Sequence, residues 1–467
     1  MILIRIKTYR FSKNVIDMIE DKKHVGIDDI SVAVPKRYID AEELAELRGV
    51  SPEKYTEGIG VKKIAILTDG ESVVSLAADA IVDLIKKNNL QPNDIGRIYT
   101  ATESSVDESK PLVCFALGRI EEELGDEYGY RFNHVQGLEN KFACIGGSYS
   151  LYDTCNWILS GMNDGKYGIV VCADEARYDV CSSGEPTQGA GAVAMLVKDD
   201  PRLLNLDFRF LGVFTQNNND FCRPFGKKTP IVNGELSNFS YLFAMRTAFD
   251  RFKEKYVNIT EDTDKNCQGS IKDDIGRDKQ FINRFDYLVF HTPYPKITKH
   301  ALAFLLRHEL RGTERWKQIC KELKIYDRVV NGDKIEDVFS NKELMDEDYS
   351  ARKKLFDLPE FADLYKNKVE SSLFAPTNIG NTYTASIFLS LSSMLEIEYQ
   401  KKRLTEGNKI GFGAYGSGSG SLVFYGTLAE EYEAVVKNIG LIKKIEDREM
   451  LPISEYDENR RFLSKPC

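Results

Sequence analysis

Apolar and polar residues follow two spacings along the chain, one typical of helices and one typical of strands. Residues 71–87 have apolar side chains at positions 73, 76, 77, 80, 81 and 84, which lie on one face of a helix. Residues 97–104 indicate a short strand that ends in a polar turn, and residues 142–162 indicate a strand end, a glycine turn and a helix. Apolar runs at 167–175 and 189–197 are typical of buried strands. This order predicts an α/β fold with helices on both faces of a sheet.

The second half of the chain repeats the same rhythm. Helical spacing predicts helices over residues 237–256, 297–310 and 381–397. An apolar strand ends at His291, and residues 409–428 indicate two strands around a glycine-rich turn. Two halves of similar plan predict a duplicated α/β unit, although no repeat is visible residue by residue.

Three segments interrupt this plan. Residues 1–23 lack the continuous apolar core and small-residue cleavage site of a signal peptide, so we interpret them as an N-terminal extension. Residues 258–282 are polar and are predicted to form a loop, whereas residues 312–372 are densely charged with weak helical spacing. We interpret both as surface insertions in the second half. The expected organisation is an extension, a first half over 24–200 and a second half over 201–467.

Composition narrows the class of protein. The chain has 467 residues, of which 42% are hydrophobic and 29% charged, and these fractions suit a soluble globular protein. No apolar run reaches the roughly 18 residues of a membrane span. The formal net charge of -9 argues against nucleic-acid binding. The nine cysteines are scattered without a C-x-x-C pair or a Cys/His cluster, which argues against disulfides and structural zinc and favours the reducing cytoplasm.

Cys144 is the candidate nucleophile. It lies between an apolar strand end and the pair Gly146–Gly147, just before a predicted helix. Backbone N–H groups and the positive end of the helix dipole favour a thiolate at such a position. A thiolate attacks a thioester readily, and the acylated product is itself a thioester. A buried structural cysteine is the alternative reading, and for that role Cys155 and Cys172 are better candidates.

Two further candidates stand at strand ends. His291 follows an apolar strand and would project into the crevice where α/β sheets bind ligands, so it could donate to a substrate carbonyl. Glu103 also follows a strand, and a carboxylate in a closed apolar site has a raised pKa and can move protons. The alternatives are a histidine that bonds a loop carbonyl and a solvated acidic turn.

Glycine-rich turns and two lysines complete the set of candidates. The turns at 184–192 and 415–420 match neither a Walker A loop nor a dinucleotide fingerprint, but they could direct backbone N–H groups into a site. Plain hairpin turns are the alternative. Lys296 and Lys299 lie one turn apart on the helix after His291 and could meet anionic groups at a pocket mouth, or simply face solvent.

Seven segments, in the order in which they occur along the chain, match the motifs of one known family. They are residues 25–50, 100–110 (TATESSVDESK), 142–150 (FACIGGSYS), 184–197 (GEPTQGAGAVAMLV), 289–302 (VFHTPYPKITKHAL), 379–391 (IGNTYTASIFLSL) and 414–428 (AYGSGSGSLVFYGTL). Together they resemble the 3-hydroxy-3-methylglutaryl-CoA synthase family of the thiolase superfamily, and the fourth segment is very close to the bacterial form. The resemblance implies a thiolase-like fold in which two duplicated βαβαβ-type halves form α-β-α-β-α layers.

The resemblance also implies a reaction. Acetyl-CoA and acetoacetyl-CoA would condense with water to 3-hydroxy-3-methylglutaryl-CoA and CoA, supplying the mevalonate route to isoprenoids. Cys144 would carry the acetyl group, Glu103 would remove a proton from its methyl, and His291 would hold and polarise the second substrate. The coenzyme A thioesters are substrates, and neither a cofactor nor a metal is implied. Analogy with the superfamily predicts a homodimer.

The remaining site residues follow from the same resemblance. The backbone N–H groups of Cys144 and Ser417 would form an oxyanion hole, and Asn381 would sit beside His291. The positions that match substrate contacts are Tyr178, Thr187, Ser237 and Lys296. The sequence departs from the family pattern at Phe142 (usually acidic), at residues 145–147 (usually small alanine-like residues), at Ser51 (usually a CoA-contacting Asp) and at His300 (usually Lys, here beside Lys299).

Three alternatives stay open at this stage. A ketoacyl-carrier-protein synthase III pairs Cys with His and Asn, but Glu103 and the 184–192 turn favour the hydroxymethylglutaryl type. A polyketide β-branching synthase shares all three catalytic residues and differs mainly in the carrier of the acyl group. A non-catalytic thiolase-fold partner protein is a third class, against which the joint presence of Glu103, Cys144 and His291 argues.

Overall fold

The computed structural model describes residues 24–128, 131–264, 280–328, 335 and 339–463. Its described strands form one nine-stranded sheet and two small sheets. The main sheet has the order β11 (Tyr287–Phe290), β12 (Lys409–Gly416), β13 (Gly420–Leu428), β8 (Leu204–Thr215), β1 (Val25–Ala33), β7 (Gly189–Asp199), β6 (Tyr167–Ala176), β4 (Ile95–Ala101) and β5 (Gln136–Asn140).

The main sheet consists of two half-sheets that meet at one short seam. β1 and β8 pair only at Gly26 with Asn205 and at Ile27 with Leu204. On one side of this seam β1–β7 and β7–β6 are antiparallel and β6–β4 is parallel. On the other side β8–β13 and β13–β12 are antiparallel and β12–β11 is parallel. This identical pairing confirms the predicted duplication, and β5 adds a parallel strand to the first half.

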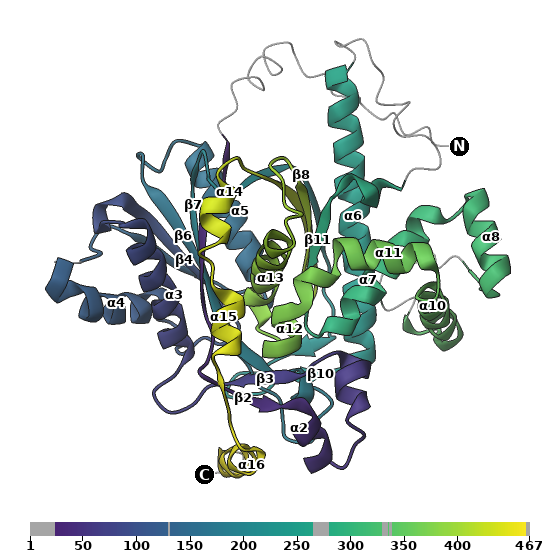
Figure 1. Cartoon of the computed structure of the whole chain (residues 1–467), viewed down its shortest axis with the longest axis horizontal. Coiled ribbons are helices and arrows are strands. Elements are labelled where there is room, and N and C mark those ends of the chain that lie inside the picture. The colour runs from purple at the N-terminus through teal and green to yellow at the C-terminus, as the bar shows by residue number, and fades with distance from the viewer. Residues whose placement is uncertain (1–23, 129–130, 265–279, 329–334, 336–338, 464–467) are drawn as a thin grey trace.

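Helices separate and cover the half-sheets. α3 (Val73–Asn88) and α4 (Leu112–Tyr128) cover the outer face of the first half, and α6 (Gly234–Asp264) and α7 (Pro295–Leu310) that of the second (Figure 1). α5 (Gly146–Leu159) and α13 (Ser386–Gln400) lie between the half-sheets. These are the α-β-α-β-α layers that the resemblance predicts.

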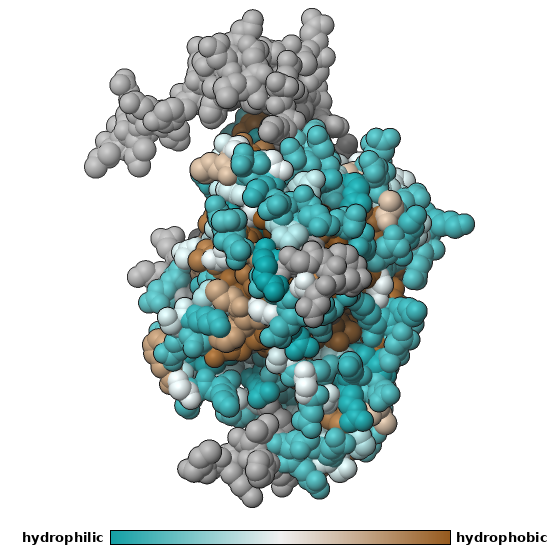
Figure 2. Space-filling model, turned by 90° about the vertical axis from the view of Figure 1, so that its left-hand side faces the viewer, coloured by the Kyte–Doolittle hydropathy of each residue, from teal (hydrophilic) through white to brown (hydrophobic). Residues whose placement is uncertain are grey.

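The central helices differ from the outer ones in the pattern that forms them. α13 is buried along nearly all of its length, as expected for a helix that is covered by sheets on both sides. α3 is amphipathic, and the Ser72 hydroxyl caps its first turn by accepting the Ser75 N–H at 3.1 Å. Its other face carries the exposed residues Asp79, Asp83 and Lys86. Figure 2 shows that the surface on this side of the molecule is mostly hydrophilic with scattered apolar residues. Each fully buried Leu, Ile or Phe stabilises these layers by about 1.5–3 kcal/mol.

Shorter elements complete the described chain. The small sheets are β14 (Glu449–Met450), β2 (Arg37–Asp40) and β3 (Lys63–Ile66), and β10 (Ile231–Val232) with β9 (Phe221–Cys222). The remaining helices and turns are α2 (Ala41–Leu47), η1 (Lys54–Ile59), η2 (Pro92–Asp94), η3 (Glu185–Thr187), η5 (Phe281–Arg284), α8 (Glu314–Leu323), α10 (Lys342–Leu355), α11 (Pro359–Lys368), η6 (Glu370–Leu373), α12 (Phe374–Ile379), η7 (Tyr383–Ala385), α14 (Tyr432–Val436), α15 (Leu441–Glu446) and α16 (Ile453–Leu463).

The predicted insertions need correction. Residues 258–264 continue α6, so the predicted loop over 258–282 is wrong at its start, and residues 265–279 lie outside the described part of the chain. Residues 312–372 contribute to the hydrophobic core as well as to the surface, because Trp316, Leu355 and Phe361 are buried in the cluster beneath α7. Most of the charges of this segment are exposed on α8, α10 and α11, but Asp348 and Arg352 on α10 are buried as an ion pair. The predicted N-terminal extension, residues 1–23, also lies outside the described residues.

One general property of the helices bears on the class of protein. Within the described residues, no helix combines the length and the apolar character needed to cross a membrane.

Candidate active site

Cys144 lies in the connection from β5 to α5, two residues before the helix begins. The preceding Ala143 has a left-handed backbone, with φ 43°. Gly147 lets the helix start closely against its neighbours, because a Cβ there would lie 2.4 Å from the Cys172 sulfur. The Cys144 thiol donates a hydrogen bond to Glu103 Oε1 over 2.8 Å. The predicted nucleophile and the predicted base are therefore in direct contact.

The protonation state of Cys144 differs from the sequence prediction. Burial raises the pKa of the thiol well above its usual value, and the neighbouring Glu103 carboxylate raises it further. The helix dipole was expected to favour a thiolate, whereas burial and the Glu103 charge both favour the neutral thiol. In the free protein Cys144 is a neutral thiol, and an acceptor for its proton is already in place.

Glu103 follows β4 directly and is 9% exposed. Burial raises the pKa of its carboxyl to about 7, with a further contribution from Asp174. Its backbone N–H donates to Asp174 Oδ1 over 2.7 Å. A carboxyl that titrates near neutral pH exchanges protons readily in both directions, as a general acid–base requires.

Asp174, on β6, is a site residue that the sequence prediction missed. Beside the Glu103 N–H, its side chain accepts from the Thr102 hydroxyl at 2.9 Å, from Ser104 at 2.9 Å and from the Thr384 N–H at 3.0 Å. It is fully buried, and burial raises its pKa to about 6. Asp174 thus ties the end of β4 to the start of α13. The only signal in the sequence was an acidic residue at the end of a buried strand.

The duplication places Thr384 where the first half has Cys144. Ala143 and Tyr383 each stand three residues before the first residue of a central helix, and both have a left-handed φ, 43° and 42°. Cys144 follows the first of them and Thr384 the second. The Thr384 hydroxyl donates to the carbonyl of Ala101 over 2.9 Å. One half therefore has the predicted nucleophile at this position, and the other has a threonine that secures the strand before Glu103.

His291 immediately follows β11, the counterpart of β4 in the second half. Its N–H donates to the Gly413 carbonyl, and its own carbonyl accepts from the Tyr241 hydroxyl, both at 2.8 Å. The side chain is 2% exposed, and burial lowers its pKa to about 3. Nδ1 has no hydrogen-bond partner within the described residues. His291 is therefore a neutral imidazole with polar capacity left for a ligand.

Asn381 and Tyr178 connect the two halves beside this group. The Asn381 N–H donates to the carbonyl of Thr187 over 2.8 Å. The side chain of Tyr178 is hydrogen-bonded with Asn381 and Tyr383, and burial raises its pKa. The Glu103 carboxylate, and Cys144 when it is ionised, raise that pKa as well, so both lie within electrostatic reach of Tyr178.

The close approach of these loops depends on glycine. Gly380 has φ 89°, and a Cβ there would lie 1.9 Å from the Gln188 carbonyl oxygen. A Cβ on Gly189 would lie 2.4 Å from the Ile379 carbonyl oxygen. The glycines on each side therefore let the 184–192 turn touch the segment that carries Asn381.

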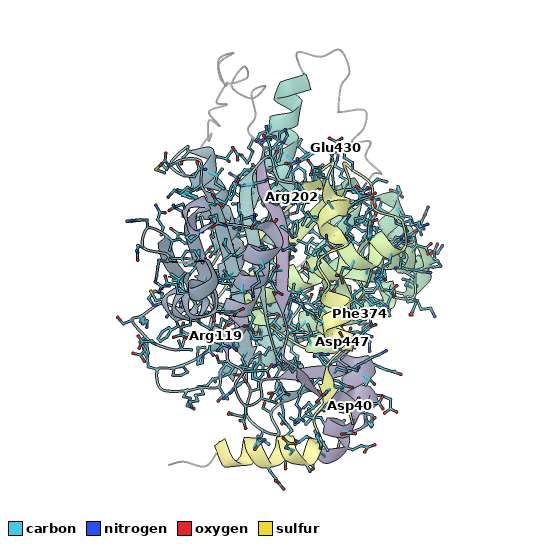
Figure 3. The ribbon with its side chains drawn as sticks, turned by 60° about the vertical axis from the view of Figure 1, so that its left-hand side comes forward. Asp40, Arg119, Arg202, Phe374, Glu430 and Asp447 are labelled. Atoms are coloured by element: carbon cyan, nitrogen blue, oxygen red, sulfur yellow. The ribbon has the colours of Figure 1, made fainter. Side chains whose placement is uncertain are left out.

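A buried ion-pair cluster contacts the 184–192 turn. Its members are Arg48, Glu185, Gln188, Tyr456 and Asp457. Arg48 binds both Glu185 oxygens, at 2.9 and 2.8 Å, and reaches Asp457 at 2.7 Å. The Tyr456 hydroxyl donates to Glu185 over 3.1 Å and also contacts the Gln188 amide. Tyr456 and Asp457 belong to α16, which lies beside α2 at the base of the molecule (Figures 1 and 3). The end of the chain thus supports the turn that carries Thr187.

Ser417 lies in the turn between β12 and β13. The Gly418 N–H next to it donates to Asp220 Oδ1, and the Tyr415 hydroxyl donates to Asp220 Oδ2, both at 2.9 Å. Ser417, Gly418, Phe142 and Ala143 line a cavity of about 1290 Å³ together with Glu103 and residues 221–228. This turn therefore faces the same space as the base, although the predicted oxyanion hole stays a prediction.

The other predicted substrate contacts lie farther from the nucleophile. Ser237 is half-buried on the first turns of α6, and Lys296 is half-buried on the first turn of α7. The Lys299 ammonium lies over the rings of Phe356 and Tyr365, 4.7 and 5.6 Å from their centroids. Lys299 therefore faces α10 and α11, and its role as an anion-binding residue stays a prediction.

Comparison with known proteins places the chain among relatives. The models "Hydroxymethylglutaryl-coenzyme A synthase N terminal" and "C terminal" match residues 21–201 and 204–464. The hydroxymethylglutaryl-CoA synthase of Haloferax volcanii is 30% identical over 93% of this chain and 90% of the relative. The cytoplasmic synthase of Homo sapiens is 32% identical over 86% of this chain and 71% of the relative.

Solved structures agree with these matches. MvaS in complex with 3-hydroxy-3-methylglutaryl coenzyme A superimposes with a TM-score of 0.76 at 31% identity, covering 95% of this chain and 93% of that one. An HMG-CoA synthase complexed with CoA has a TM-score of 0.67 at 26% identity, covering 93% and 90%. The chain therefore belongs to the hydroxymethylglutaryl-CoA synthase family.

Proposed function

We propose that the protein condenses acetyl-CoA with acetoacetyl-CoA and water to give 3-hydroxy-3-methylglutaryl-CoA and CoA through an acetyl-Cys144 intermediate. The contact between the Cys144 thiol and Glu103, a carboxyl whose pKa burial raises to about 7, carries this proposal. Membership of the family supports it, as does the likeness to a structure that holds the expected product. The proposal routes each step through the protein's own residues and includes no resident cofactor.

The first step transfers the acetyl group. The Cys144 sulfur attacks the thioester carbonyl of acetyl-CoA while its proton passes to Glu103 Oε1, the acceptor 2.8 Å away. The bond from the acetyl carbon to the CoA sulfur then breaks, and that sulfur takes the proton from Glu103. The net result is acetyl-Cys144 and free CoA, with Glu103 again ionised. Backbone N–H groups at Cys144 and Ser417 would stabilise the oxygen that becomes negative during the attack.

The second step forms the carbon–carbon bond. Glu103 removes a proton from the acetyl methyl, and the C–H electron pair enters the enolate. The enolate carbon attacks the ketone carbon of acetoacetyl-CoA, and the ketone oxygen takes the proton back from Glu103 as it becomes a hydroxyl. Neutral His291 would donate its N–H to the acceptor, because burial keeps the pKa of the imidazole near 3.

The third step releases the product. Water attacks the carbonyl that joins the product to Cys144, and Glu103 takes a water proton. The carbon–sulfur bond breaks, and the proton returns to the Cys144 sulfur. One carboxylate of the product is thus free, and the other end remains a CoA thioester.

Product identification tests the proposal directly. The protein is mixed with acetyl-CoA and acetoacetyl-CoA, and the products are analysed by mass spectrometry. In a parallel experiment, intact-protein mass after acetyl-CoA alone should show one acetyl group in the wild type and none in Cys144→Ala. The absence of an adduct, in protein whose Cys144 reacts with iodoacetamide, would support a non-catalytic member of the fold.

The carrier of the acceptor separates the nearest rival. A β-branching synthase acts on an acyl-carrier protein, so acetoacetyl-carrier protein is offered in place of acetoacetyl-CoA. We expect the CoA thioester to be preferred. Faster condensation on the carrier protein would assign the chain to the branching type instead. A ketoacyl synthase would release a product that lacks the added carboxylate.

We further propose that the protein forms a homodimer in the cytoplasm. β5 pairs with β4 on one side, and its other edge has no strand partner in the described chain. Leu138 on this edge is 43% exposed. An open edge strand is a template for a second strand, and a second copy of β5 would satisfy it. Size-exclusion chromatography with light scattering tests the dimer, and a monomer at micromolar concentration would contradict it.

A further inference from the structure

The segment between β8 and α6 crosses the active site and is anchored on both sides. Asn218 N–H donates to the Gly418 carbonyl over 2.7 Å, and Asp220 accepts from the opposite turn as described above. The Phe221 ring meets the Tyr383 ring edge-on, with centroids 6.2 Å apart. The next residues, Cys222 and Arg223, are therefore held over the end of β4.

Arg223 extends from this segment to Glu103. Its guanidinium donates to the backbone carbonyl of Glu103 and lies 3.8 Å from Glu103 Oε2. The other carboxylate oxygen, Oε1, accepts the Cys144 thiol. The two side chains are only 22% and 4% exposed, so solvent screens their attraction weakly. Glu103 is thus held between a nucleophile on one oxygen and a cation on the other.

The charges around Glu103 make this cation significant. The charged and titratable groups that face Glu103 are Asp174 on β6, Asp220 and Arg223 in the crossing segment, Cys144 before α5, Tyr178 after β6 and Tyr383 before α13. Burial and the two aspartates raise the pKa of the Glu103 carboxyl, whereas the hydrogen bond from Cys144 and the charge of Arg223 lower it. Without Arg223, the ionised carboxylate would face mainly negative or neutral groups.

We propose that Arg223 is a positioning residue that holds Glu103 in place and ionised for the step that forms the carbon–carbon bond. This inference rests on the proposed function. Once Cys144 is acetylated, Glu103 Oε1 no longer has a thiol donor, and that oxygen must face the acetyl methyl. The Arg223 contacts do not involve the sulfur, so they persist through this change. They therefore matter most in condensation, after acetyl transfer is complete.

Two variants and a matched control separate this role from general stabilisation. Arg223→Met removes the charge and keeps the length, and Arg223→Lys restores a charge. Arg177→Met is the control, because Arg177 lines the same cavity but pairs with Glu175 at 2.7 Å. Thermal unfolding shows whether each variant is folded.

Single-turnover kinetics measure the two steps apart. For Arg223→Met we expect condensation to slow by about tenfold or more and acetylation by acetyl-CoA to slow less, because the Cys144 thiol still holds Glu103 Oε1 in the free protein. The pH midpoint of condensation should rise by about one pH unit, because the carboxylate has lost its cation. Arg223→Lys should recover most of the midpoint, and Arg177→Met should match the wild type. Equal slowing of both steps with an unchanged midpoint would overturn the proposal, and so would an unchanged condensation rate.

A measurement without substrate separates this inference from the proposed function. Infrared titration follows the carboxyl band of Glu103, identified by its loss in Glu103→Gln. The midpoint should be higher in Arg223→Met than in the wild type, whatever reaction the protein catalyses. An identical midpoint in the two proteins would contradict the proposed role of Arg223. A shifted midpoint in a protein that makes no 3-hydroxy-3-methylglutaryl-CoA would contradict only the proposed reaction.

Discussion

The Cys144 thiol donates its hydrogen bond to Glu103 at 2.8 Å, so the nucleophile and the base titrate as a coupled pair. Burial raises the pKa of both groups, the Glu103 charge raises that of the thiol further, and the hydrogen bond from the thiol lowers that of Glu103. The pair therefore holds one transferable proton before substrate arrives. In the proposed reaction, acylation of the sulfur would remove that proton and leave Glu103 free to act on carbon.

Removing the carboxylate should separate the two chemical steps. In Glu103→Ala the charge that raises the Cys144 pKa is gone, so a thiolate forms more easily and acetyl-Cys144 still accumulates. Condensation should fall by about a thousandfold or more, because the methyl proton has no acceptor. Intact mass follows the first step and product mass spectrometry the second. Glu108→Ala, an exposed change at the same cavity, is the control; substantial condensation in Glu103→Ala would refute the role of Glu103.

The rate of condensation should increase with pH through a midpoint near 7. Glu103 must be ionised to act as a base, and its pKa is raised to about 7. His291, with a pKa lowered to about 3, stays neutral throughout and should add no second limb above pH 4 or so. Single-turnover condensation by preformed acetyl-enzyme, measured between about pH 5 and 9, checks this. A midpoint near the ordinary glutamate value would contradict the buried base.

Glu103→Gln should stabilise the protein at high pH and not at low pH. The folded-state pKa of Glu103 lies above its unfolded value, so its contribution to stability is fully present below about pH 4.5 and is lost as the pH rises through 7. The glutamine variant avoids this loss, which is on the order of 3 kcal/mol above pH 8 or so. Urea unfolding at both ends of this range measures the difference. Equal effects at the two pH values would show that burial does not destabilise the ionised form of the Glu103 carboxyl.

Gly380→Ala should impair both stability and catalysis. The added Cβ meets the Gln188 carbonyl oxygen at 1.9 Å, and the residue has φ 89°. We expect a loss of about 2–4 kcal/mol of folding free energy and a lower kcat, because Asn381 is displaced. Gly407→Ala is the matched control, with φ 82° and open space around its Cβ. It should lose only about 1 kcal/mol and keep its kcat; equal losses in the two variants would exclude the close loop contact as the cause.

The candidate site residues that could be predicted from the sequence are those next to the end of a strand or the start of a helix. Glu103 follows β4, His291 follows β11, and Cys144 precedes a central helix, so local patterns were enough to place each of the three at the end of an element. Asp174 and Arg223 carry no periodic signal, and their partners are 71 and 120 residues away in the chain. Helical spacing placed Lys299 on α7, but only the packing of α10 and α11 shows which way its ammonium points.

Local chemistry was predicted less well than position. The expected thiolate at Cys144 followed from the helix dipole, which the sequence reveals. Desolvation and the charge of Glu103 oppose it, and both arise from segments that come together only in the folded chain. The segment that contains α8, α10 and α11 was predicted to form surface insertions because its sequence is densely charged. Its few buried residues, such as Trp316 and Phe361, stand apart in that sequence and meet the core only in the folded chain.

One buried cluster links α16 to the candidate active site, so a change to α16 is expected to affect that site. The cluster is formed by Arg48, Glu185, Gln188, Tyr456 and Asp457. Through Tyr456 and Asp457, α16 reaches the turn that carries Thr187. A truncation or a bulky fusion that pulls α16 away would strip partners from Arg48 and Glu185, both nearly buried. Displacing α16 would therefore leave these two buried charges with fewer partners and loosen the 184–192 turn that contacts Asn381.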